Sequence, residues 1–201
     1  MNNPQPQPPR QKPARPRLSI LRLIAIVFLT LIILVGIAVL IIWLVVRPRH
    51  LVYTVEDGSI HSFNIADNHL NSTFDFILRA YNPNNKVSVY YDSIEARVEY
   101  DDQTLASDAV QPFFQPHKNV TRFEVKLKSQ SVALFGSMPK DLKLERSSGG
   151  VELSVQIKAK IRFKVGAWKS RHMILRVYCS PVLVHFSSSR GFERTYCDVE
   201  L

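Results

Sequence analysis

An uncharged apolar segment near the N-terminus constrains this chain more than any other feature. Residues 23–46 read LIAIVFLTLIILVGIAVLIIWLVV and contain no charged side chain. As a helix they would be roughly 36 Å long, enough to cross a ~30 Å hydrocarbon core. A buried core helix is rarely apolar on every side over this length. A cleaved signal peptide has a shorter apolar region followed by a small-residue cleavage site. We therefore predict a transmembrane signal-anchor helix over residues 18–46.

The charge distribution predicts the orientation of this helix. The chain has a formal net charge of +9, but residues 1–50 contain seven Lys or Arg and no acid, while residues 51–201 hold nineteen bases against seventeen acids. Five of the seven bases precede the apolar segment, so the positive-inside rule places the N-terminus in the cytosol and the C-terminal bulk across the membrane. A nucleic-acid-binding domain concentrates its bases in the folded part. Nucleic acid is therefore not the expected partner.

The segments on either side of the helix have no pattern of a folded core. Residues 1–17, MNNPQPQPPRQKPARPR, are rich in Pro, Gln and Arg. We predict a disordered cytosolic tail with polyproline II character. Its bases either set the topology alone or also attract anionic headgroups. Residues 47–58 are predicted to be a linker.

Beyond the linker the hydrophobic periodicity is two, which is typical of β-strands. The clearest run is VELSVQIKAKIRFKV at residues 151–165. Its length of roughly 50 Å as one strand predicts a bend or a bulge within it. Each run is apolar on one side only, which favours two antiparallel sheets packed face to face over residues 59–201. A short helix is expected between residues 130 and 150. Further strand-like runs lie at 59–66, 73–81, 86–91, 94–100, 122–128 and 173–186.

A turn-rich motif, YNPNNKVSVYYD at residues 81–92, interrupts the strand pattern. Pro83 has no N–H and cannot lie inside a central ladder, and it holds Asn82 in an extended conformation. Asn84 and Asn85 tolerate the positive φ values of a tight reversal. The motif therefore predicts a corner at residues 82–85 between two strands.

This motif, together with the apolar span and the terminal CDVEL, resembles the plant harpin-induced-like family. That family includes the non-race-specific disease resistance protein, and its ectodomain is called late embryogenesis abundant group 2. The resemblance covers about residues 20–201. The matching motif positions are Asn82, Pro83, Asn84, Lys86, Val87, Val89, Tyr90, Tyr91 and Asp92.

The resemblance implies both a fold and a function. The fold is an immunoglobulin- or fibronectin-III-like β-sandwich outside the cytosol, carried by a single-pass plasma-membrane protein. The function is a non-enzymatic role in plant defence and stress responses, through association with other membrane or defence-signalling proteins or through contact between membrane and cell wall. Two alternatives stay open: a membrane-tethered lipid-binding or lipid-transfer module, and a hydrolase.

Covalent features follow from the predicted topology. Cys179 and Cys197 are the only cysteines. Outside the cytosol they are expected to form a disulfide worth about 3 kcal/mol, and the alternative is a pair of unpaired buried thiols. Asn71 and Asn119 begin Asn-x-Thr sequons and are candidate glycosylation sites on the same side of the membrane.

The sequence offers one candidate binding surface and no catalytic site. The histidines lack metal-ligand spacing, and neither a nucleophile motif nor a phosphate loop occurs, so no catalytic residue, metal or cofactor is predicted. On a strand, Lys158, Lys160, Arg162 and Lys164 share one face about 6.6 Å apart. We interpret this row as a candidate polyanion-binding face for acidic wall polysaccharide or lipid headgroups. The alternative is a solvated face that blocks edge-to-edge aggregation.

Overall fold

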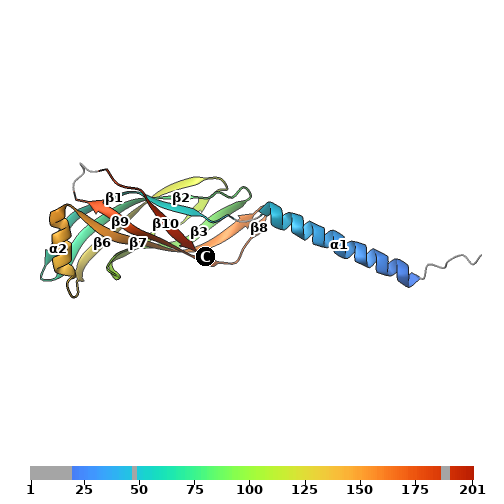
Figure 1. Cartoon of the computed structure of the whole chain (residues 1–201), viewed down its shortest axis with the longest axis horizontal. Coiled ribbons are helices and arrows are strands. Elements are labelled where there is room, and N and C mark those ends of the chain that lie inside the picture. Colours follow the sequence, from blue (N-terminus) through green and yellow to red (C-terminus); the bar gives the residue numbers. More distant parts are fainter. Residues whose placement is uncertain (1–19, 47–48, 187–190) are drawn as a thin grey trace, which may run out of the picture. The chain divides into compact units, whose positions relative to one another are not determined.

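A computed structural model describes residues 20–46, 49–186 and 191–201, with the side chains of residues 41–46 excepted. The predicted tail over residues 1–17 lies outside the described residues. Helix α1 spans Ile20–Val46 (Figure 1). Its segment Ile20–Leu40 has a mean hydropathy of 3.3, and none of it is buried within the protein. These are the length and composition of a membrane-crossing helix.

The chain divides into two units, the first ending at Arg47 and the second running from Pro48 to Leu201. We call the second the sheet domain. In its described residues, ten antiparallel strands form a single sheet with the order β4-β3-β7-β9-β10-β1-β2-β6; β5 pairs with β3, and β8 pairs with β7. The strands are β1 (Val52–Ala66), β2 (His69–Tyr81), β3 (Val87–Tyr100), β4 (Gln103–Val110), β5 (Phe113–Gln115), β6 (Val120–Ala133), β7 (Gly150–Val165), β8 (Trp168–Lys169), β9 (Met173–His185) and β10 (Thr195–Glu200).

The strand pairing does not confirm the predicted immunoglobulin- or fibronectin-III-like β-sandwich. The short strand β10 pairs with β1 on one side and with β9 on the other. Backbone hydrogen bonding therefore continues from β4 to β6 through one sheet, where a sandwich would have two. Strands β4 and β6, at the two ends of the order, lie close together. The result is a nearly closed antiparallel sheet, curved by long strands with register shifts.

Two predicted boundaries are corrected by the strands. β1 begins at Val52, so the predicted linker over residues 47–58 is wrong beyond residue 51. β3 is one strand where the sequence indicated two runs, at 86–91 and 94–100. Its pairing with β7 shifts between Tyr91 and Ser93, so Asp92 is an extra, bulged residue. The bulge breaks the alternation without ending the strand.

Two predictions in the C-terminal half are confirmed. β7 is one continuous strand over Gly150–Val165. Its pairing with β9 shifts register between Leu153 and Val155, which is the bulge or bend that the sequence predicted. The expected short helix is α2, Met138–Ser148. Gly149 ends it with φ +94°, a left-handed conformation that favours glycine at a helix C-terminus.

The interior of the curved sheet is filled by large side chains. The apolar residues of the alternating runs point inward, and aliphatic side chains make up most of this core. A polar group lies among them: the hydroxyls of Tyr53 and Tyr91 hydrogen-bond to each other, and Tyr91 also donates to Gln115 Oε1 at 3.2 Å. Burial raises the pKa of both tyrosines, so they remain neutral hydrogen-bonding groups. The largest fully buried side chains include Tyr53, Phe74, Phe76, Leu70, Leu78, Leu105, Leu127 and Leu142.

Candidate functional site

The corner of the family motif is held by two buried amides, Asn82 and Asn84. Asn84 makes two hydrogen bonds to the backbone of Arg49: its Oδ1 accepts from the N–H at 2.6 Å, and its Nδ2 donates to the carbonyl at 2.9 Å. Asn82 Nδ2 donates to the carbonyls of Val87 at 2.8 Å and Pro116 at 3.1 Å. We call Asn82 and Asn84 the asparagine clamp. It joins the start of the sheet domain, the corner and the segment before β6.

The corner is therefore not the tight reversal that the sequence predicted. β2 and β3 do not pair with each other: β2 pairs with β1 and β6, whereas β3 pairs with β4, β5 and β7. The expectation of positive φ at Asn84 and Asn85 is also wrong, since neither is among the positive-φ residues. Asn84 acts through its side chain, and its N–H donates to Asn82 Oδ1 at 3.1 Å in an Asx-type turn.

The Tyr-Tyr-Asp end of the motif faces both sides of the sheet. Tyr91 is buried in the interior with Tyr53, while Tyr90 is only partly buried. The bulge lets Asp92 point to the outer surface, toward β7. One three-residue stretch thus supplies a core hydrogen bond and a surface charge.

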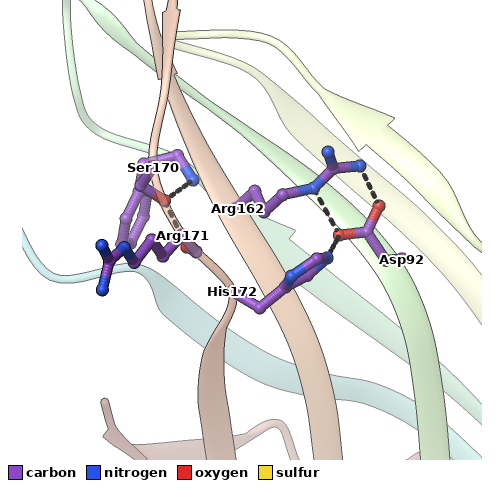
Figure 2. A network of polar contacts seen from close by, with 6 residues as sticks. Asp92, Arg162, Ser170, Arg171 and His172 are labelled. Carbon is purple, nitrogen blue, oxygen red and sulfur yellow. Dashed lines mark hydrogen bonds and ion pairs between the residues drawn. The ribbon is translucent and has the colours of Figure 1, made fainter.

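On the outer surface Asp92 is the centre of a polar network (Figure 2). Arg162 binds it with two hydrogen bonds, Nε to Oδ2 at 2.8 Å and Nη2 to Oδ1 at 2.5 Å. His172 Nε2 lies 3.4 Å from Oδ2. Hydrogen bonding by Arg162, followed by the positive charges of Arg162, His172 and Lys160, holds the pKa of Asp92 below its ordinary value. Ser170 fixes the segment that carries His172, because its Oγ accepts from the Phe163 N–H at 2.9 Å.

The four predicted bases lie on one face of β7, but one of them forms an ion pair with an acid. The structure places Lys158, Lys160, Arg162 and Lys164 along the outer side of β7, as the sequence predicted. Arg162 is neutralised by Asp92, the acid that the motif supplies. Within the described residues, the three lysines form no ion pair with a carboxylate. Glu95 is paired in register with Lys158 but binds Arg97 at 2.8 Å.

Neighbouring strands extend this face with further bases. Lys169 of β8 lies opposite Lys164, and Arg176 of β9 lies opposite Lys158. The Tyr90 ring is approached by Lys169 Nζ at 4.7 Å and by Lys164 Nζ at 6.0 Å, within the range of cation–π attraction. Lys169 is not part of the row that the sequence predicted. No periodic signal indicates that the hairpin after β7 folds it back beside Lys164.

The remaining predicted residues have these positions. The sulfur atoms of Cys179 and Cys197 are 2.05 Å apart, at disulfide distance, and would tie β9 to β10. Asn71 and Asn119 are exposed, and their glycosylation stays a prediction. Asn71 Oδ1 accepts a hydrogen bond from the Ser131 N–H at 2.8 Å. The Asn119 carbonyl accepts from the Asn82 N–H at 3.0 Å.

These features define a class of protein: one apolar helix followed by an antiparallel sheet domain with an asparagine-held corner. Comparison with known proteins identifies the family that has these features. The family model described as "Late embryogenesis abundant protein" (LEA_2) matches residues 78–179. The chain is 39% identical over 183 residues to an uncharacterized protein of Arabidopsis thaliana, covering 89% of this chain and 82% of the relative.

Further Arabidopsis thaliana relatives carry the family name NDR1/HIN1-like. NDR1/HIN1-like protein 10 is 32% identical over 88% of this chain and 79% of its own length. NDR1/HIN1-like protein 3 is 35% identical over 87% of this chain and 78% of its own. This chain therefore belongs to the NDR1/HIN1-like, late embryogenesis abundant group 2 family. Members are membrane-associated and not known as enzymes, and membership implies a role in plant defence or stress responses.

The Asp92 network predicts a pH dependence of stability. Because the folded-state pKa of Asp92 is lowered, its ionised form stabilises the fold fully above the ordinary carboxyl pKa of about 4. That contribution is lost as the pH falls through the lower, folded-state pKa. The Asp92→Asn variant should be less stable than wild type at pH 7, and its urea midpoint should fall less steeply below about pH 4.

The matched control is Asp102→Asn, which removes an exposed carboxylate from the turn between β3 and β4. This control should keep the wild-type slope. If Asp92→Asn and wild type lose stability in parallel on acidification, the Arg162 pair does not stabilise the fold.

Proposed function

We propose that this protein is a non-enzymatic plasma-membrane component of plant defence and stress responses. In this proposal α1 anchors the chain with its N-terminus in the cytosol, and the sheet domain lies outside the cell. It acts by contact between membrane and cell wall, holding an acidic polymer on the outer face of β7, or by association with other membrane or defence-signalling proteins. The observation that carries the polymer-binding part is the row of Lys158, Lys160 and Lys164.

The geometry suits a linear polyanion. Alternate residues of a strand repeat every ~6.6 Å, so the three lysines present charges along one line on the sheet surface. Lys169 broadens the line beside Lys164. Arg176 lies beside Lys158 but is also directly opposite Glu200 of β10 in the strand register. Arg162 in the middle is held by Asp92 and orders the surface without adding free charge. Such a strip attracts carboxylate groups mainly through salt-dependent Coulomb forces.

The lipid-transfer alternative needs space for a lipid in the sheet domain. The described interior is occupied by the buried core side chains. A groove of about 500 Å³ lies between β4 and β6 and opens to solvent; its lining includes Val110, Phe113 and Phe123. Within the described residues, this groove is one place at the surface where the domain could hold a lipid. Lipid extraction from the purified protein with mass spectrometry tests this alternative directly.

Neutralising the β7 face should weaken binding to polygalacturonate. We expect the triple variant Lys158→Gln, Lys160→Gln, Lys164→Gln in nanodiscs to bind roughly tenfold more weakly, because three exposed contacts of about 0.5 kcal/mol each are lost. The control Lys128→Gln, Lys140→Gln, Lys143→Gln removes the same charge from exposed positions on β6 and α2. Equal affinities of the two variants would mean that the β7 face is only a solvated surface.

Glycosylation tests the proposed topology. In plant cells, endoglycosidase treatment should increase the gel mobility of the wild-type protein, and Asn71→Gln with Asn119→Gln should abolish the shift, because only extracytosolic sequons receive glycans. Protease added to sealed vesicles from the cytosolic side should leave the sheet domain intact. Digestion of that domain from the cytosolic side would contradict the orientation.

A further inference from the structure

The connecting segments at one end of the sheet domain meet at the asparagine clamp. The clamp bonds Arg49 and the carbonyl of Pro116 to the motif corner, and pairing of Val87 with Val165 brings the β7–β8 hairpin to the same end. Helix α2 lies at the opposite end (Figure 1). We call the clamp end the proximal end. Its connecting segments, all within the described residues, are 49–51, 82–86, 116–119 and 166–172.

The two ends of the sheet domain differ in charge. The four proximal segments contain no Asp or Glu. They contain five exposed bases: Arg49, Lys86, Lys118, Lys169 and Arg171.

At the opposite end, the β1–β2 turn contains Asp67, and the β3–β4 turn contains Asp101 and Asp102. Helix α2 carries both signs of charge. β10 is antiparallel to β1 and therefore ends toward the proximal end, where it adds the acid Glu200. Because five exposed bases stand against this acid, the proximal end keeps an excess of positive charge.

Exposed apolar side chains accompany these proximal bases. Trp168, the first residue of β8 after the hairpin turn, is 63% exposed, and Phe114 of β5 is 44% exposed. Gly166, with φ +58°, permits the tight turn that presents Trp168. Val52, Val120 and Met173, at the proximal ends of β1, β6 and β9, are also exposed. Exposed aromatic rings among bases are typical of surfaces that enter the membrane–water interface.

The hairpin also contains an electrostatic conflict. Lys164 and Lys169 are directly opposite each other in the register of β7 and β8. Like charges directly opposite on paired strands are destabilising. The flanking Tyr90 and Phe114 rings attract these ammonium groups but carry no net negative charge. An anionic group bound between the two lysines would relieve the repulsion.

We infer that the proximal end docks on the phosphate headgroups of the bilayer that holds α1, an inference that rests on the proposed membrane anchor. Only residues 47 and 48 separate the last residue of α1 from Arg49 in the chain. A chain reaches at most about 3.6 Å per residue, so covalent connectivity keeps Arg49 within about 11 Å of that helix end. The bases bind phosphate oxygens, and Trp168 enters the interface.

Single-tryptophan proteins in nanodiscs test this inference. Trp43 and Trp168 are the only tryptophans. The Trp43→Phe variant leaves Trp168 as the reporter, and the Trp168→Phe variant leaves Trp43 within α1. A third variant, Trp43→Phe with Trp168→Phe and Phe135→Trp, puts the reporter at an exposed position just before α2. The probe is phosphatidylcholine brominated near its headgroup, mixed with phosphatidylglycerol.

We expect the brominated lipid to quench Trp168 and to leave the Phe135→Trp reporter unquenched. Replacing Arg49, Lys86, Lys118, Lys169 and Arg171 with Gln should abolish the quenching of Trp168. An unquenched Trp168 beside a quenched Trp43 overturns the docking while the anchor stands. Failure to quench Trp43 refutes the anchor itself. Shielding of Trp168 from iodide by polygalacturonate, without lipid quenching, would assign this end to an acidic polymer and overturn the proposal.

Discussion

The sheet domain depends on the hydrogen bonds of two buried amides, Asn82 and Asn84. Three segments far apart in the sequence meet there, and each offers backbone groups that are partly or fully buried. Such groups cost about 1–3 kcal/mol each when they lose their partners. Asn84 satisfies both the N–H and the carbonyl of Arg49, which fixes where β1 begins. Since β1 pairs with β2 and β10, the position of this first strand affects both sides of the sheet.

The family motif joins the clamp to the surface through a short stretch of β3. The clamp holds the start of that strand, Tyr91 secures it to the core, and the bulged Asp92 turns outward to Arg162. The same motif thus orders two regions. One is the proximal end of the sheet with its bases, and the other is the middle of the β7 face. A change in the motif should therefore be transmitted to both proposed binding surfaces.

Much of this organisation follows from short-range patterns in the sequence. The apolar run of residues 23–46 predicts α1, and the alternation of residues 151–165 predicts β7, because both depend on local periodicity. The alternation gives the buried face of each strand but not the order of the strands. The six residues of β10 decide between a single sheet and a sandwich, and a strand that short leaves a weak signal.

In the candidate site, too, local patterns were predictable and long-range contacts were not. The row of bases on β7 was predictable because all its members lie on one strand. Neutralisation of Arg162 by Asp92, seventy positions away, was not. The hydrogen-bond partner of Asn84 could not be predicted either, because Arg49 lies thirty-five positions earlier. The motif indicated a turn, whereas the amide side chains form long-range bonds.

Hydrogen exchange of backbone amides, followed by mass spectrometry, tests the central role of the clamp most directly. In wild type, the segments around residues 49–53, 82–87 and 116–120 should exchange slowly and at a common rate, as one cooperative unit. Asn84→Ala should speed exchange in all three segments and leave α2 unchanged, while Asn85→Ala, at the exposed neighbour, should change none of them. Faster exchange confined to residues 82–87 in Asn84→Ala would show that the corner is an ordinary turn and that the sheet does not depend on it.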